Sequence, residues 1–344
     1  MGLYQLVRMQ SLLEQNYIIL DGGMGTELAR LGYDTLYDDE LWGARLLISK
    51  PDIVKQAHIN FLHAGADIIE TNTYQINVEF LKKVMGVTEL EAIRVIQTGV
   101  SIARDAVEEY WKSLDHSADR MKPLVAGSVG SFGAMLLDGS EYTGTFADNM
   151  TEKELMDWHR PRMKVLVESG VDVLALETIP CANEAAALVK LLKEFPSMKA
   201  WLSFSCRDKG LSCKHQSDDS SRDSLTKSSG ITCRGELLSE AVHPAISSDQ
   251  ILAVGVNCTH PDAVTDCLLE LQEANKKKKL LVYANSGEPW DDKLKWYGKE
   301  KMVPLTSYLE KWYNLGARWI GGCCRINPSD ISDIRTKLDD LTSH

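Results

Sequence analysis

One apolar run near the end of the chain reads Ala317-Arg318-Trp319-Ile320-Gly321-Gly322-Cys323-Cys324. Its apolar composition and short length are typical of a buried strand, and the two cysteines come where that strand should end. A second run of the same kind, Ile251-Leu252-Ala253-Val254-Gly255-Val256-Asn257-Cys258, also stops at a cysteine. Both runs are continuous rather than alternating in polarity, which indicates parallel strands buried on both faces.

Runs of this kind recur along the whole chain and are separated by segments of helical length. The predicted strands cover residues 17–20, 66–70, 123–126, 171–176, 199–204, 251–256, 280–284 and 318–320. Between them, segments such as 93–110 carry apolar residues at three- and four-residue spacing, which is typical of amphipathic helices. Eight strand–helix pairs predict an α/β protein, a single TIM-type (β/α)8 barrel that forms one domain over residues 1–344.

A doubly wound open sheet is the alternative architecture. Its dinucleotide fingerprint would have to lie in Gly22-Gly23-Met24-Gly25-Thr26-Glu27-Leu28, where the third glycine of that motif is missing. The barrel is therefore the better prediction.

One segment interrupts the alternation of strands and helices. Residues 207–235 are rich in Ser, Asp and Lys and contain few apolar side chains. Such a composition buries too little surface to offset the entropy of ordering the chain, so a mobile insertion is predicted after the fifth strand. In a barrel this loop lies on the catalytic face, and both a lid and plain disorder remain open.

Charge and composition exclude several classes of protein. A formal net charge of −11 argues against a nucleic-acid partner, which favours a basic surface. No run reaches the length of about 18 apolar residues that a membrane span needs, and the N-terminus resembles neither a secretory nor a transit signal. Eight cysteines in this context are typical of reduced thiols, so a cytoplasmic protein is expected.

Polar side chains gather where the predicted strands end, which in a barrel is the catalytic face. The thiols of Cys258, Cys323 and Cys324 follow the sixth and eighth strands. Three thiolates at one rim can hold a zinc ion and leave its fourth tetrahedral position free for a substrate sulfur, whereas magnesium and calcium prefer oxygen ligands. Simple packing is the alternative, and it is our interpretation of Cys206, which also ends a strand but has no adjacent cysteine.

Carboxylates form a second group at the same level. Asp21, Glu70 and Glu177 end the first, second and fourth strands, where they would attract the ammonium group of an amino-acid substrate. Capping of a loop or pairing with a neighbouring Arg is the alternative for each of them. No Lys and no His ends a predicted strand, which counts against a Schiff-base or a histidine acid–base mechanism.

Together these motifs resemble those of a known family. The chain is similar to the homocysteine S-methyltransferases, in particular the plant enzymes that use S-methylmethionine, over residues 17–328. The resemblance is carried by Leu20-Asp21-Gly22-Gly23-Met24-Gly25-Thr26-Glu27-Leu28, Glu70-Thr71-Asn72-Thr73-Tyr74-Gln75, Leu176-Glu177-Thr178-Ile179-Pro180, Gly255-Val256-Asn257-Cys258-Thr259 and Gly321-Gly322-Cys323-Cys324.

The resemblance implies roles for single residues. In this family the three cysteines bind Zn²⁺, which points to Cys258, Cys323 and Cys324 as metal ligands. Contacts to the amino-acid moiety of homocysteine are implied for a second set of residues, namely Asp21, Glu177 and Thr71.

The implied reaction is methyl transfer from S-methylmethionine, or less well from S-adenosylmethionine, to the thiol of L-homocysteine, which gives methionine. Selenocysteine remains open as an acceptor. Methyltetrahydrofolate is not expected as a donor, because related cobalamin-dependent enzymes need further domains to use it.

Two departures concern the donor and the oligomeric state. Betaine-using relatives have a Tyr directly after the strand-four Glu, where this chain has Thr178, and they carry a long C-terminal extension used for oligomerisation. Both differences favour a sulfonium donor and a monomer, with a betaine-type enzyme as the alternative. The insertion at 207–235 also looks longer than the loop that is usual in the family.

A hypothesis of another class is a non-catalytic barrel that senses zinc or thiols, with Cys323 and Cys324 as a redox pair. Adjacent cysteines close only a strained eight-membered disulfide ring, which disfavours this hypothesis.

Overall fold

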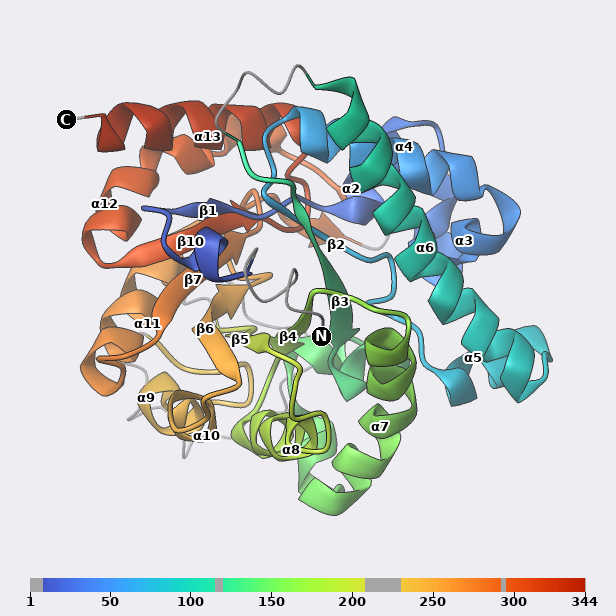
Figure 1. The fold of residues 1–344 in the computed structure, drawn as a ribbon. Coiled ribbons are helices and arrows are strands. Elements are labelled where there is room, and N and C mark those ends of the chain that lie inside the picture. Colours follow the sequence, from blue (N-terminus) through green and yellow to red (C-terminus); the bar gives the residue numbers. More distant parts are fainter. Residues whose placement is uncertain (1–8, 115–119, 208–229, 292–294, 344) are drawn as a thin grey trace.

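A computed structural model describes residues 9–114, 120–207, 230–291 and 295–343. In it, parallel strands follow one another around a central axis, and helices lie outside them (Figure 1). The strands of the main sheet are β1 (Ile18–Ile19), β2 (Ile68–Glu70), β3 (Leu124–Gly130), β4 (Val173–Ile179), β5 (Ala200–Phe204), β6 (Ile251–Asn257), β7 (Lys279–Ala284) and β10 (Ala317–Gly322). They pair in the order β1-β10-β7-β6-β5-β4-β3-β2. A parallel bridge between Leu20 and Ile68 joins the two edges. The sheet thus closes, and the predicted (β/α)8 barrel is confirmed.

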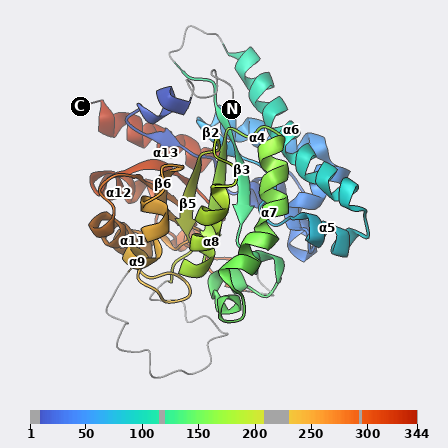
Figure 2. The same ribbon diagram turned by 60° about the horizontal axis from the view of Figure 1, so that its bottom comes forward.

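Helices surround the barrel and shorter elements lie in its loops (Figure 2). The α-helices are α2 (Met24–Arg30), α3 (Leu46–Ser49), α4 (Pro51–His63), α5 (Val78–Met85), α6 (Glu89–Ser113), α7 (Glu152–Glu168), α8 (Ala182–Leu192), α9 (Leu238–Ala241), α10 (His243–Ile246), α11 (Pro261–Ala274), α12 (Leu309–Asn314) and α13 (Pro328–Thr342). The 3-10 helices are η1 (Asp34–Asp38), η2 (Trp42–Arg45), η3 (Phe132–Met135), η4 (Ser140–Tyr142), η5 (Thr145–Asp148), η7 (Lys299–Lys301) and η8 (Leu305–Ser307). A two-stranded antiparallel ribbon, β8 (Trp290–Asp291) and β9 (Lys295–Trp296), follows β7. Among the described residues, no helix combines the length and the apolar composition needed to cross a bilayer.

Capping explains where two of the long helices begin. The Thr88 side chain accepts a hydrogen bond from the backbone of Glu91 at the start of α6, and the Glu91 side chain accepts from Thr88 in return. Thr151 and Glu154 form the same capping box at the start of α7. Each box satisfies backbone N–H groups that have no partner within the helix.

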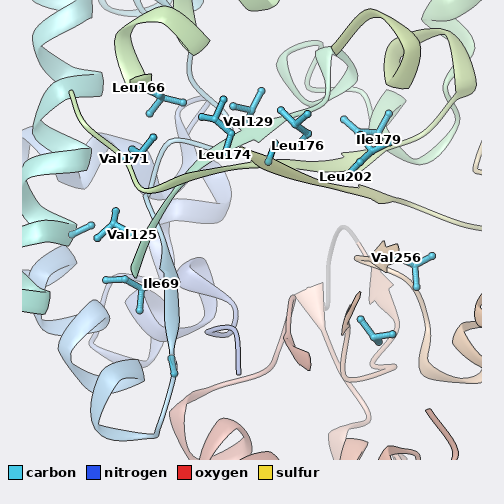
Figure 3. Packing of buried hydrophobic residues seen from close by; sticks show 14 of the residues in the cluster. Ile69, Val125, Val129, Leu166, Val171, Leu174, Leu176, Ile179, Leu202 and Val256 are labelled. Carbon is cyan, nitrogen blue, oxygen red and sulfur yellow. The ribbon is translucent and has the colours of Figure 1, made fainter. Parts of the chain in front are cut away.

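The strands are buried on both faces, as their continuous apolar runs predict. Outward-facing side chains pack under the helices; Figure 3 shows Val129 of β3 and Leu174 of β4 near Leu166 of α7. Inward-facing side chains fill the barrel, where Trp201 lies edge-on to Trp319 with ring centroids 5.7 Å apart. This division into an outer and an inner apolar layer is the usual core of a closed parallel barrel.

The N-terminal end of the barrel is plugged by the helical residues 9–13. Met9 and Leu12 are buried there against inward-facing residues such as Ile18 and Leu124. The opposite end, where the strands have their carboxyl ends, remains available for a site.

The predicted strands match the observed ones in number and order, although β3 continues four residues beyond the predicted end at residue 126, and the end of β4 differs in an informative way. The sequence predicts that the fourth strand ends at Leu176, but β4 continues through Glu177 and Thr178 to Ile179. Its register with β5 shifts between Leu176 and Ile179, and Thr178 has a positive φ of 58°. This irregularity adds one residue to β4 between Leu176 and Ile179. Glu177 and Thr178 therefore both line the cavity, whereas regular alternation would direct only one of them inward.

The ends of the predicted insertion meet beside β5. The backbone N–H of Arg207 donates to the carbonyl of Ile231 at 3.2 Å, and Cys206 forms an antiparallel bridge with Thr232. Residues 208–229 of the insertion lie outside the described residues, so its predicted mobility stays a prediction.

Candidate metal centre and substrate pocket

A cavity of about 1260 Å³ opens at the carboxyl ends of the strands. Small-molecule sites are typically about 300–1000 Å³, so this cavity has room for two small ligands. The sequence-predicted site residues all line it, namely Asp21, Glu70, Thr71, Glu177, Cys258, Cys323 and Cys324.

The sulfur atoms of Cys258, Cys323 and Cys324, here called the thiol cluster, all lie within 4.8 Å of one another. Three sulfurs on one tetrahedral ion, with bonds of about 2.3 Å, lie about 4 Å apart. Small side-chain movements would therefore close the cluster on an ion. It is the one group of three or more His, Cys, Asp or Glu side chains with metal-binding spacing in the described part of the chain.

The backbone around the cluster explains why these thiols converge. Cys258 has a positive φ of 48°, which turns the chain sharply at the end of β6. The N–H of Cys324 donates to the side-chain carbonyl of Asn285 at 3.1 Å. A Cβ atom on Gly23 would lie 2.5 Å from the Cys323 carbonyl oxygen. The Asp-Gly-Gly motif therefore lets the loop after β1 pack closely against the cysteine pair.

The thiols of the cluster compete for a single negative charge. Hydrogen bonds from Cys323 and Cys324 lower the pKa of the Cys258 thiol well below its usual range. In turn, the hydrogen bond to Cys258 is the largest factor that raises the pKa of both Cys323 and Cys324. A cation is required before all three can be thiolates together, and thiolate sulfur favours a soft divalent metal. The donor set fits such a metal.

Asp21, Glu70 and Glu177, here called the carboxyl cluster, lie together in the cavity. The side chain of Asp21 accepts a hydrogen bond from the backbone N–H of Glu70 at 2.9 Å, and Ser128 donates to Glu177. Asp21 and Glu177 are only 4% and 5% exposed. The carboxyls of Glu70 and Glu177 interact directly, and one buried carboxylate oxygen of Glu70 has no donor in the described structure.

Burial raises the pKa values of all three carboxyls, and their mutual repulsion adds to the effect for Asp21 and Glu70. The pKa of Glu177 rises to about 7, because burial outweighs the hydrogen bonds that favour its charged form. Carboxylates that share a poorly solvated space in this way are stabilised by an incoming cation, such as the ammonium group of an amino acid.

Thr71 lies beside the carboxyl cluster, but its hydroxyl is engaged within the protein. Its oxygen accepts from the backbone N–H of Ser128 at 3.0 Å and lies 2.7 Å from the Thr73 hydroxyl oxygen. Thr71 is almost completely buried, so its remaining contribution to a ligand is the part of its surface that lines the cavity.

A link between the two clusters was missed by sequence reasoning. The side-chain carbonyl of Asn257 accepts from the backbone N–H of Thr178 at 2.8 Å, and its amide donates to the Thr178 hydroxyl at 2.7 Å. Asn257 directly precedes Cys258, and Thr178 directly follows Glu177. The only signal in the sequence was the position of Asn257 at a strand end, and that position alone does not reveal its partner.

Backbone strain concentrates around the cavity. The non-glycine residues with positive φ in the described chain are Trp42, Leu137, Thr178, Cys258 and Arg325. The first four line the cavity, and Arg325 follows the cysteine pair. Such conformations are costly, and they persist where a site depends on them.

Cys206 lines the cavity but is not part of the thiol cluster. Its pKa is raised, first by burial and then by its hydrogen bond with the Cys267 thiol. A protonated, buried thiol of this kind agrees with our interpretation of Cys206 as a packing residue.

Comparison with known proteins bears out the predicted family. The model of the homocysteine S-methyltransferase family matches residues 18–338. Homocysteine S-methyltransferase YbgG of Bacillus subtilis (strain 168) is 42% identical over 318 residues, which span 92% of this chain and 93% of that protein. A betaine-homocysteine S-methyltransferase of Drosophila melanogaster is 38% identical, with 93% of each chain covered. Homocysteine S-methyltransferase 1 of Zea mays is 36% identical over 95% of each chain.

A solved structure extends the comparison to three dimensions. The metallated form of the homocysteine methyltransferase MmuM from Escherichia coli matches with a TM-score of 0.79 and 32% identity, over 96% of this chain and 99% of that one. Its fold and coverage agree with the barrel described above. This chain belongs to the homocysteine S-methyltransferase family.

Proposed function

We propose that this chain, as a single barrel domain, transfers a methyl group from a sulfonium donor, in the first place S-methylmethionine, to the thiol of L-homocysteine. The proposal includes Zn²⁺ held by Cys258, Cys323 and Cys324. The observation that carries it is the convergence of three sulfurs within 4.8 Å beside a cluster of buried carboxyls. The existence of a metallated form of MmuM supports a metal in this family.

Zinc supplies, when bound, a Lewis acid that lowers the pKa of a substrate thiol from about 8.5 and so favours the nucleophilic thiolate at neutral pH. The three cysteines would provide its protein ligands. Because three thiolates and a divalent ion together carry a net negative charge, the site also attracts a positively charged donor.

The carboxyl cluster orients the acceptor. In this proposal Asp21 and Glu177 receive the ammonium group of homocysteine, and Glu70 adds negative charge beside them in the same lining. Ser128 fixes the Glu177 carboxyl by a hydrogen bond, so the acceptor meets a preorganised surface. Thr71 lines the wall beside them.

Methyl transfer then needs little further chemistry from the protein. The homocysteine sulfur, whose proton has passed to solvent, forms a bond to the methyl carbon while the bond from that carbon to the donor sulfur breaks. The donor leaves as a neutral thioether, so no general acid is required.

Betaine is a second candidate donor, because a relative of similar length carries that name, so chain length does not separate the two donors as we expected from the sequence. Thr178 after the strand-four Glu favours the sulfonium donor for this chain. The acidic net charge and the enclosed cavity at the strand ends further support small-molecule substrates without nucleic acid, and we propose a monomer acting in the cytoplasm.

Parallel assays with each donor test the proposal. Zinc-loaded protein is supplied with L-homocysteine and with S-methylmethionine, S-adenosylmethionine or betaine, and methionine is measured. We expect the highest kcat/KM with S-methylmethionine, a lower value with S-adenosylmethionine and none with betaine. Methionine formed from betaine alone would contradict the proposed donor, and no methionine from any of the three would contradict the proposed reaction.

A further inference from the structure

The cavity lining holds more carboxylates than the acceptor requires. Most of those outside the carboxyl cluster are paired within the protein or open to solvent: Asp39 is paired with Arg45, Asp262 accepts from Tyr308, Glu288 is paired with Arg325, and Glu40 is exposed. Glu141 on η4 differs from these. One of its carboxylate oxygens is buried without a hydrogen-bond partner, as is one of Glu288, but Glu141, unlike Glu288, forms no ion pair with a cationic side chain of the described residues.

A positive charge also lines this cavity. Arg207 follows β5, and its guanidinium donates to the backbone carbonyls of Cys233 at 2.8 Å and Arg234 at 3.2 Å. These bonds hold the guanidinium in place without neutralising it, and no carboxylate of the described chain is paired with it. Apart from His260, Arg207 is the one basic side chain in the described lining of the cavity.

Contacts between the two loops place Glu141 and Arg207 near each other. The Ser205 hydroxyl, two residues before Arg207, donates to the backbone carbonyl of Glu141 at 2.8 Å. A Cβ atom on Gly144, three residues after Glu141, would lie 3.1 Å from the side chain of Arg234, whose carbonyl accepts from Arg207. The two charged groups thus sit on adjoining loops, yet they form no ion pair with each other.

Glu141 also lies within electrostatic reach of the thiol cluster. Burial is the main cause that raises the pKa of its carboxyl to about 7, and the charge on Cys258 adds to the rise. It belongs to the loop after β3, eleven residues beyond the end of that strand, whereas the carboxyl cluster sits at the strand ends themselves. A ligand held at Glu141 would therefore approach the thiol cluster from another part of the cavity than the acceptor does.

Given the function proposed above, we infer that Glu141 and Arg207 form a second amino-acid site, which binds the head group of the methyl donor. The Glu141 carboxylate receives the donor's ammonium group, and the Arg207 guanidinium receives its carboxylate. The ligand class is an α-amino acid with a sulfonium side chain. Betaine fits poorly, because its quaternary nitrogen has no N–H to donate to Glu141.

Binding measurements on two variants test this site. In Glu141→Gln and Arg207→Gln, we expect the dissociation constant for S-methylmethionine, measured by calorimetry, to rise about tenfold or more, because each loses a charged hydrogen bond. Affinity for L-homocysteine and zinc content should stay unchanged. Glu40→Gln is the matched control, since it removes an exposed carboxylate from the same lining and should leave both affinities unchanged.

A donor analogue assigns the two roles separately. The compound (3-aminopropyl)dimethylsulfonium has the ammonium and the sulfonium groups of the donor but no carboxylate. Its affinity should therefore fall in Glu141→Gln and stay unchanged in Arg207→Gln. Unchanged S-methylmethionine affinity in both variants would overturn the inference, as would an equal loss of homocysteine affinity or of zinc, which would indicate a structural role. Failure of the proposed reaction itself would be distinct, because wild-type protein would then form no methionine from S-methylmethionine.

Discussion

The sulfurs of Cys258, Cys323 and Cys324 lie within 4.8 Å of one another at metal-binding spacing, and this separates them from Cys206, whose buried thiol is hydrogen-bonded to that of Cys267. The distinction matters for function because a buried thiol outside such a cluster stays protonated, whereas three thiols at metal-binding spacing can become thiolates together once a cation is present. The two kinds of cysteine therefore provide a test and its control within one cavity.

Substituting Cys323 by Ser should release zinc and reduce methyl transfer by at least about a hundredfold, because a serine hydroxyl does not ionise as readily and is a poor ligand for zinc. Cys206→Ser should keep both properties. Metal analysis and methionine formation measure the outcome. Full activity of the Cys323 variant after exhaustive chelation would show that something other than a metal generates the thiolate.

Glu177 should make ligand binding depend on pH. Its raised pKa of about 7 means that it is a carboxylate above that pH and increasingly protonated below it. Affinity for L-methionine, which has the ammonium group but no thiol to ionise, should therefore fall below pH 7, by up to about tenfold per pH unit. Titrations from pH 5.5 to 8.5 measure this.

The variant Glu177→Gln keeps the shape of the side chain and removes the charge. It should bind L-methionine and L-homocysteine more weakly at pH 8, lose the part of the pH dependence near pH 7 that Glu177 contributes, and retain zinc. Wild-type affinity for L-methionine and L-homocysteine in the Gln variant would show that Glu177 does not bind their ammonium group.

At the scale of elements, β4 and β6 position the two clusters together. Asn257, at the end of β6, holds the irregular segment of β4 through two hydrogen bonds to Thr178. Glu177 directly precedes Thr178, and Cys258 directly follows Asn257. The position of the Glu177 carboxyl in β4 therefore depends on β6, the strand that ends at the proposed metal ligand Cys258.

Replacing Asn257 by Ala should lower the free energy of unfolding by about 1–3 kcal/mol, since it removes both bonds and leaves the Thr178 N–H without a partner in a buried place. Affinity for zinc and for homocysteine should fall together, because both clusters lose their shared support. Urea denaturation and calorimetry measure these effects. Asn275→Ala, on the loop after α11 and outside the cavity lining, removes three hydrogen bonds of its own and is the control for a loss of stability alone. It should leave both affinities unchanged, and an equal loss of affinity in the two variants would contradict this role of Asn257.

These elements also show what the sequence could and could not predict. The eight strands, the thiol cluster and the carboxyl cluster were recoverable because each depends on a local run of residues and on the rule that parallel strands end at one rim. The continuation of β4 through Thr178 could not be predicted, because it depends on hydrogen bonds from Asn257, which lies 79 residues after Thr178 in the chain. Glu141 and Arg207 were missed for a similar reason, as they lie in irregular loops whose contacts have no periodicity.

At the scale of the whole molecule, stability and chemistry reside at opposite ends of the barrel. The inner apolar layer and the helical residues 9–13 fill the end away from the cavity. Tyr283 connects the two ends, because its hydroxyl accepts from the Trp201 indole at 3.0 Å and its side chain also lines the cavity.

Leu12→Ala should therefore destabilise the protein without changing its reaction. Leu12 is 2% exposed, and truncation of such a side chain costs about 2–5 kcal/mol, depending on how far the surroundings relax. Chemical denaturation should show the loss, while kcat and zinc content stay at wild-type values below the unfolding transition. A large loss of kcat in the folded Leu12→Ala variant would mean that the helical residues 9–13 influence the cavity at the other end of the barrel.

The central claim is that three cysteines hold zinc and leave one position for the sulfur of homocysteine. X-ray absorption at the zinc edge, recorded before and after addition of L-homocysteine, tests it most directly. The account predicts three sulfur neighbours at about 2.3 Å in the free protein and four after addition, with no such change on adding L-methionine. A shell that already has four sulfurs, or one that does not change when L-homocysteine binds, would contradict it.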